Sequence, residues 1–135
     1  MALIKWDSSM SVNVAEIDRQ HQKLIDMINE LDDGMRQGKG KDKLASIIGG
    51  LASYAQVHFR TEEKYFQQFG YAEAPAHLRE HEDFTRKVSD FKAKFDSGKI
   101  GLSLEVMSFL SSWLQNHIKN SDMKYAGFFK EKGLS

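Results

Sequence analysis

Hydrophobic residues recur at helical spacing along most of the chain, and alternation of the β type is scarce. Four stripes have this spacing; the later three run over residues 44–66, 84–95 and 106–114. Side chains three or four residues apart share one face of a helix, so each stripe predicts an amphipathic helix. The first stripe contains Leu24, Ile28, Leu31 and Met35.

Glycine and proline mark the breaks between these stripes. Gly70 follows Phe69 as a helix C-terminal stop, and Pro75 suits the first turn of the third helix. Ser103 is an N-cap candidate for the fourth helix. The remaining breaks fall at Gly34, Gly38, Gly40, Gly98 and Gly101. We therefore predict helices over 17–37, 42–69, 75–96 and 103–120, with a short fifth segment over 123–131 that ends before Gly133.

The connections between these helices are short, which makes consecutive helices antiparallel. The predicted fold is all-α: an antiparallel up-down-up-down four-helix bundle with an N-terminal arm and a short C-terminal helix. The first dozen residues form the arm, and we expect Trp6 to pack it onto the bundle. At this length and without an internal repeat, residues 1–135 are expected to form a single domain.

Composition narrows the class of protein. The formal net charge is zero, which gives no indication of a nucleic-acid or membrane-surface partner. There is no cysteine, so a disulfide framework and a thiolate metal site are both excluded. We find no secretory signal and no long apolar run that would insert in a membrane. These features fit a protein of the reducing cytosol, and a cytoplasmic location is expected.

The chemistry of the chain is concentrated in its five histidines. One stands alone, two head the strings His-x-x-x-Glu and His-x-x-x-His, a fourth ends the second of these strings, and the fifth opens His-x-x-x-x-Asp. Five imidazoles and two carboxylates are a plausible ligand set for a pair of transition metals. The seven residues are His21, His58, Glu62, His77, His81, His117 and Asp122.

Helix phase and depth both predict that these side chains meet. Each histidine continues the apolar stripe of its helix, so it points into the core. From the turn near Gly38, about 17 residues lead back to His21 and roughly 20 lead forward to His58, which sets both at similar heights at ~1.5 Å per residue. About 17 residues lead back from the turn at Gly98 to His81, and a similar number lead forward from that turn to His117, so these two histidines also lie at similar heights. A lone histidine on an apolar face is usually a satisfied core residue, whereas five in one layer with a glutamate would be costly without a metal.

Asp122 fits this geometry less simply. It lies five residues after His117, about 140° around an ideal helix. Both can face the site only if the helix widens or ends there, and a one-turn π-bulge would suffice. Spacing alone leaves a solvent-facing Asp122 equally open.

The number and type of ligands indicate the metal. Zinc usually takes four ligands, and seven fit two six-coordinate ions that share bridging carboxylates. Five imidazoles then divide three and two, which leaves one metal with a position open to a small molecule. The nitrogen-rich set suits iron.

The absence of a motif bears on the reaction. Di-iron carboxylate proteins use Glu-x-x-His pairs, and here the residues three before the histidines are Asp18, Ala55, Ala74, Leu78 and Leu114. A histidine-rich shell supplies less negative charge than a carboxylate-rich one and disfavours high-valent iron. The pattern therefore favours reversible binding over oxidation.

A lone His followed by His-x-x-x-Glu, His-x-x-x-His and His-x-x-x-x-Asp resembles the hemerythrin signature, in particular that of single-domain bacterial hemerythrins. The resemblance covers roughly residues 6–130 and fills all seven ligand positions, Asp122 included. It implies a non-heme di-iron centre bridged by Glu62, Asp122 and a solvent-derived oxygen. It also implies that His77, His81 and His117 hold the coordinatively full iron, and that His21 and His58 hold the iron at which dioxygen binds.

Several apolar residues lie one to four positions from these ligands. They are expected to be plain core and also a dry wall that protects bound oxygen: Leu24, Ile25, Phe59, Trp113, Leu114 and Ile118. Tyr125 lies three residues after Asp122, where it is either a hydrogen-bond donor to a ligand or a surface aromatic.

The function expected from these residues is reversible dioxygen binding for oxygen carriage, storage or delivery, without enzyme activity. An oxygen-consuming enzyme is a candidate partner. Two alternatives stay open: an oxygen sensor that acts through a separate partner protein, and a di-iron oxidase, peroxidase or nitric-oxide scavenger.

Overall fold

The computed structural model describes residues 4–38, 41–97 and 104–134, with the backbone alone for 41–42 and 104–106. The described residues form a 3₁₀-helix, five α-helices and one π-helix, and they contain no strand. In chain order these are η1 (Ser8–Met10), α1 (Ala15–Arg36), α2 (Lys41–Phe69), α3 (Ala74–Asp96), α4 (Leu104–Asn116), the π-helix η2 (His117–Asp122) and α5 (Met123–Glu131).

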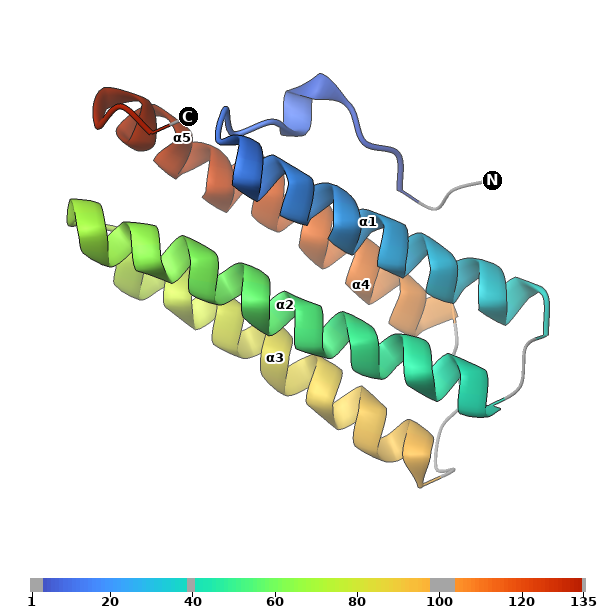
Figure 1. Ribbon diagram of the computed structural model, residues 1–135. Coiled ribbons are helices and arrows are strands. Elements are labelled where there is room, and N and C mark those ends of the chain that lie inside the picture. Colours follow the sequence, from blue (N-terminus) through green and yellow to red (C-terminus); the bar gives the residue numbers. More distant parts are fainter. Residues whose placement is uncertain (1–3, 39–40, 98–103, 135) are drawn as a thin grey trace.

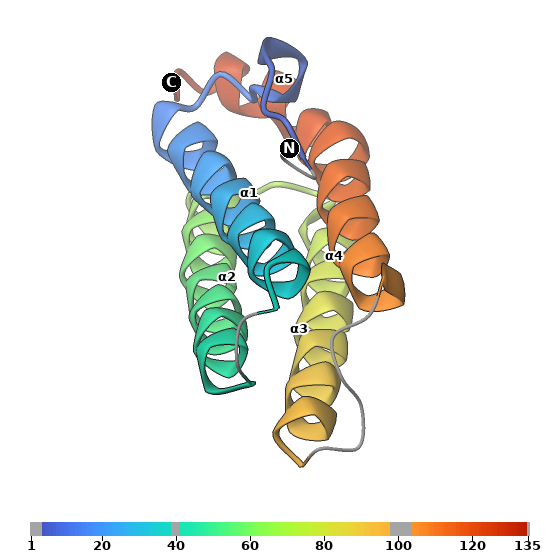
Figure 2. The same cartoon turned by 90° about the vertical axis from the view of Figure 1, so that its right-hand side faces the viewer.

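The predicted all-α bundle is confirmed. α1 to α4 run up, down, up and down, and successive helices lie side by side (Figures 1 and 2). The first three predicted helices begin and end within two residues of α1, α2 and α3. Among the described residues, no helix combines the length and the apolar character needed to cross a membrane.

The fourth predicted helix differs from the structure at its end. We expected it to stop at residue 120 and a separate segment to follow, but the chain stays helical from α4 through η2 into α5. The predicted first-turn position of Pro75 and the helix stop at Gly70, with φ of 69°, are confirmed. The N-cap predicted at Ser103 and the stripe residue Val106 lie outside the described side chains.

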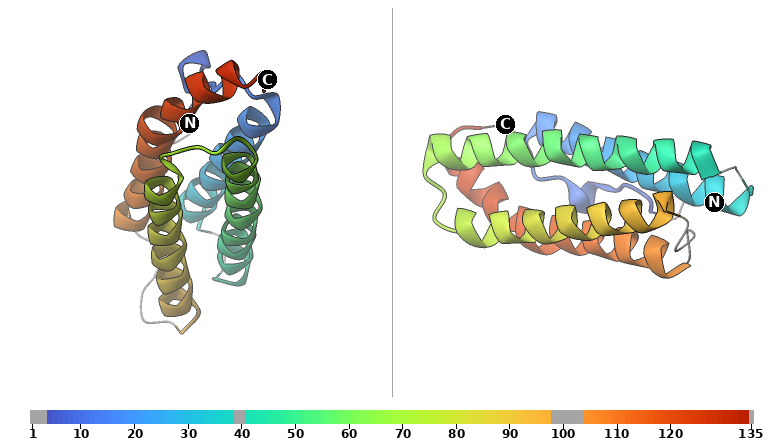
Figure 3. Two further views of the ribbon diagram at one scale, coloured as in Figure 1. Left: turned by 90° about the vertical axis from the view of Figure 1, so that its left-hand side faces the viewer. Right: turned by 90° about the horizontal axis from the view of Figure 1, so that it is seen from below.

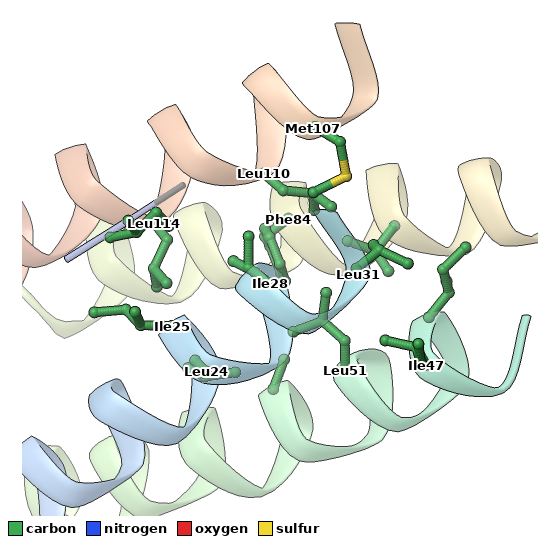
Figure 4. Close-up of a cluster of buried hydrophobic side chains, with 14 of the residues drawn as sticks. Leu24, Ile25, Ile28, Leu31, Ile47, Leu51, Phe84, Met107, Leu110 and Leu114 are labelled. Carbon is green, nitrogen blue, oxygen red and sulfur yellow. The ribbon is translucent and has the colours of Figure 1, made fainter. Parts of the chain in front are cut away.

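The apolar interior consists of two clusters at different heights. The larger fills the bundle between α1, α2, α3 and α4, and Figure 4 draws part of it. The smaller lies at the other end, where the arm and α5 close the bundle (Figure 3). Its buried members are Val12, Val14, Ile17, Phe66, Tyr71, Tyr125 and Phe129.

The N-terminal arm is held against the bundle by paired polar contacts. Asn29 of α1 accepts from the Ile4 backbone N–H at 2.9 Å and donates to the Ile4 carbonyl at 2.8 Å. Asp18 accepts from the Ser11 hydroxyl at 2.5 Å and from the Val12 backbone N–H at 2.9 Å. Trp6 packs against the larger cluster, as predicted.

Phe129→Ala should destabilise the protein by about 3–5 kcal/mol, because the side chain is fully buried between α5, α2 and the arm. Urea unfolding followed by circular dichroism measures the loss. Lys130→Ala, an exposed change on the same helix, is the control and should stay within about 0.5 kcal/mol. Equal losses for the two variants would contradict the closing role of α5.

Candidate metal centre

The seven side chains singled out in the sequence lie together in one layer of the bundle, between the two apolar clusters. α1 supplies His21, α2 supplies His58 and Glu62, α3 supplies His77 and His81, and η2 supplies His117 and Asp122. All seven are at most 3% exposed. His58 and Glu62 come late in α2, and His77 and His81 come early in α3, so the layer lies near the end of the bundle that carries the α2–α3 turn, at the predicted depth.

Asp122 reaches the layer because the helix widens. Residues His117–Asp122 form a π-helix, which is the distortion that the five-residue spacing required. Asp122 is fully buried, so the solvent-facing alternative is wrong. Ser121, which would share a face with His117 on an ideal α-helix, instead donates from its hydroxyl to Glu80 of α3 at 2.6 Å.

The ligand atoms gather into two overlapping groups, each with its atoms within 4.8 Å of one another. Glu62 belongs to both. The three-histidine group is Glu62, His77, His81 and His117, and the two-histidine group is His21, His58, Glu62 and Asp122.

Asp122 also spans the two groups. Its Oδ2 lies 2.9 Å from the Nε2 of His21, in the two-histidine group. Its Oδ1 lies 2.9 Å from the Nε2 of His77 and 3.1 Å from that of His117, both in the three-histidine group. The two carboxylates are therefore the residues positioned to join two ions.

The atoms that face one another in this layer lack hydrogen bonds. Separations between ring nitrogens and carboxylate oxygens are 2.9–3.6 Å, but the Nε2 of every histidine, the Oε1 of Glu62 and both oxygens of Asp122 have no hydrogen-bond partner. Buried polar atoms of this kind are costly to leave unpaired. Their lone pairs converge, and a nitrogen and carboxylate donor set of this size fits transition-metal ions.

The charges in the layer are strongly coupled. Burial lowers the pKa of His58 to about 4. Burial acts in the same direction at His77 and His117, but neighbouring carboxylates, above all Asp122, outweigh it and raise their pKa values to about 9 and about 10. Burial acts to raise the pKa values of Glu62 and Asp122, and the Asp122 charge acts in the same direction on Glu62, but the histidines hold both pKa values well below their usual range. Without a metal, the layer therefore holds protons on His77 and His117.

The outer ring nitrogens have partners that sequence reasoning missed. The Nδ1 of His58 lies 2.8 Å from the side-chain oxygen of Gln20. The Nδ1 of His81 lies 3.2 Å from Glu63, and the Nδ1 of His117 lies 2.9 Å from Glu80. With Nδ1 as the donor, each ring turns the lone pair of its Nε2 inward.

A weak signal for these partners exists in the sequence. Gln20, Glu63 and Glu80 each stand next to a ligand, at His21, Glu62 and His81. A polar residue one position from a ligand lies about 100° around the helix, where it can reach the histidine of a neighbouring helix. Many surface residues share that property, so the pattern by itself selects none of them.

Tyr125 and the aromatic rings complete the surroundings. Tyr125 is fully buried and donates its hydroxyl to the Oε2 of Glu62, so it binds a candidate ligand and is not a surface aromatic. Burial and the two carboxylates raise its pKa well above the usual value. The ring of Phe59 stacks on that of His81 with a centroid separation of 3.9 Å, and the ring of Trp113 stacks on that of His117 with a centroid separation of 4.5 Å. Both aromatic rings therefore lie beside the three-histidine group.

The other four residues predicted to wall the oxygen site are buried aliphatics of the larger cluster, namely Leu24, Ile25, Leu114 and Ile118. Ile25 of α1 and Leu114 of α4 both lie in the space between these helices (Figure 4). They follow His21 and precede His117 by three or four residues, so they lie on the side of the layer that faces the larger cluster.

Comparison with known proteins agrees with this geometry. The family model described as the hemerythrin HHE cation binding domain matches residues 12–129. Bacteriohemerythrin of Pseudomonas aeruginosa (strain LESB58) is 37% identical over 125 residues, which are 93% of this chain and 80% of that protein. Bacteriohemerythrin of Methylococcus capsulatus is 32% identical over 93% of this chain and 95% of its own length. A crystal structure of wild-type hemerythrin has a TM-score of 0.88 and 31% identity, and covers 93% of this chain and 97% of that one. The chain therefore belongs to the hemerythrin family.

Proposed function

We propose that this protein binds dioxygen reversibly at a non-heme di-iron centre, for oxygen carriage, storage or delivery, and that it is not an enzyme. Its seven ligands are the side chains of the layer, with Glu62, Asp122 and a solvent-derived oxygen as bridges. The proposal includes a cytoplasmic location and an oxygen-consuming enzyme as the partner that receives the gas. Membership of the hemerythrin family, whose model is described as a cation binding domain, supports the metal centre of this proposal.

The unequal division of the histidines is the observation that carries this proposal. Two groups share Glu62, yet one contributes three imidazoles and the other only two. Two six-coordinate ions that share the same bridges would therefore differ by one protein ligand. The position served by His21 and His58 is left with room for a small molecule.

The bound irons would supply the electrons that dioxygen takes up and returns. The chain's own residues would orient the ligands and exclude water. Gln20 accepts from the Nδ1 of His58 and thereby directs its Nε2 inward. Tyr125 binds the Oε2 of Glu62, which leaves Oε1 for the layer. The aliphatic wall keeps water from the open position.

The donor set also supports binding over oxidation chemistry. Only two of the seven ligands are carboxylates, and Glu-x-x-His is absent from the sequence. Carboxylate-rich sites stabilise the high-valent iron that oxidation needs. A nitrogen-rich site with an apolar wall favours release of the same molecule that entered.

Visible spectroscopy combined with an iron assay tests the proposal on the purified protein. We expect two irons per chain and an absorption band that appears with air and disappears when oxygen is removed, over repeated cycles. One zinc per chain, or no colour change, would overturn it. Irreversible turnover in stopped-flow mixing with a reducing substrate would support the oxidase alternative instead.

Leu114→Asn should shorten the lifetime of the oxygenated form several-fold, because an amide in the aliphatic wall brings water to the open position. Autoxidation followed by the decay of the visible band measures the lifetime. Leu110→Asn makes the same change one turn further from the ligands and controls for general destabilisation. An unchanged lifetime in Leu114→Asn, or equal effects of the two variants, would remove the protective role of Leu114.

The affinity of the site for metal should increase as the pH rises. The raised pKa values of His77 and His117 mean that protons occupy both rings at neutral pH when no metal is bound. A metal must displace these protons, so the apparent affinity for Fe²⁺ should rise with pH up to about 10, where His117 also loses its proton. Anaerobic chelator competition, corrected for protonation of the chelator, measures this slope. A flat profile between about pH 7 and 9 would contradict the charge state of the layer.

A further inference from the structure

We infer that the two metal positions are unequal by construction, and that the three-histidine position retains its iron more tightly than the two-histidine position. Glu80 and Glu63 are the positioning residues that produce much of this difference. The inference rests on the proposed di-iron centre. It concerns the outer hydrogen bonds of the ligands and not the ligands themselves.

The outer partners of the histidines differ in charge between the two positions. In the three-histidine group, His117 and His81 have carboxylate partners, Glu80 and Glu63. In the two-histidine group, His58 has the neutral amide of Gln20. A carboxylate that accepts from Nδ1 makes the imidazole a stronger donor to a metal than an amide does.

His21 adds to the inequality. Its Nδ1 is buried and has no hydrogen-bond partner among the described residues. The ring is therefore oriented by packing alone and gains no electron density from an acceptor. Both histidines of the two-histidine group thus lack a charged partner, whereas two of the three in the other group have one.

Glu80 is the better placed of the two carboxylates. Its Oε1 lies 2.9 Å from the Nδ1 of His117 and also accepts the hydroxyl of Ser121 at 2.6 Å. Two donors fix its position, and both are presented by the π-helix. Glu63 lies further from its ring, at 3.2 Å from His81, and borders an open cleft of about 360 Å³ between α2 and α3. Both carboxylates are partly exposed, 42% for the Glu80 side chain and 36% for that of Glu63, so exposure does not distinguish them. The shorter contact and the second donor should give Glu80 the larger influence.

The test uses the iron-loaded, reduced protein under anaerobic conditions. A coloured Fe²⁺ chelator is added stepwise, and the iron released per chain is counted. The wild-type protein should lose its iron in two steps, with one ion leaving at clearly lower chelator concentration. Far-UV circular dichroism at each step verifies that the bundle stays folded.

Substitutions that change charge but not shape identify which step each residue controls. Glu80→Gln keeps an acceptor for His117 and should weaken the tighter step about 10–100-fold while the looser step stays unchanged. Glu63→Gln should act on the same step to a smaller extent. Glu82→Gln is the matched control. Glu82 borders the same cleft, has no hydrogen bond or ion pair with a histidine among the described residues, and should change neither step.

Gln20→Glu provides the opposite test. It gives His58 a carboxylate partner, so it should tighten the looser step and bring the two steps closer together. Damage to the fold cannot produce tighter binding, so this gain separates a positioning role from a structural one.

The outcomes separate this inference from the proposed function. Two irons that leave in a single step, or a Glu80→Gln variant that behaves like Glu82→Gln, would overturn the inference while the di-iron carrier stands. Two steps that shift as expected in a protein without a reversible oxygen band would support the inference and overturn oxygen carriage. A single iron per chain would overturn both.

Discussion

The whole bundle is organised around one buried layer in which imidazole nitrogens and carboxylate oxygens face one another without hydrogen bonds. Removing so many polar atoms from water is unfavourable unless something replaces the water. In the absence of metal, ion pairs between Asp122 or Glu62 and protonated histidines offset part of that penalty. Two apolar clusters, one on each side of the layer, exclude solvent and hold it in place.

Much of this layer could be predicted from the sequence because helix geometry is regular. Phase places His21, His58 and His81 on the buried faces, and counting residues to the turns places them at one depth. The same regularity makes Asp122 an exception that can be detected. Its five-residue distance from His117 is incompatible with an ideal helix, and the structure resolves the conflict with a π-helix instead of a helix end.

What the sequence could not supply was pairing across helices. Gln20, Glu63 and Glu80 are ordinary polar residues at helix positions next to ligands, and only the packing of α1 on α2 and of α3 on its neighbours gives them histidine partners. Tyr125 was ambiguous for the same reason. Tyr125 is buried because α5 packs over the end of the bundle. α5 reaches that position because the helix continues through η2.

The π-helix explains features of the layer that helix phase and residue spacing do not explain by themselves. By widening the turn, it brings Asp122 into the layer and at the same time directs Ser121 onto Glu80. It also carries α5, and with it Tyr125, to the position from which the tyrosine binds Glu62. One local distortion therefore determines the burial of Asp122 in the layer, the contact of Ser121 with Glu80 and the position of α5. An ideal α-helix at residues 117–122 would place Ser121 on the face of His117, so Asp122 would turn away from the layer and Ser121 would lose its contact with Glu80.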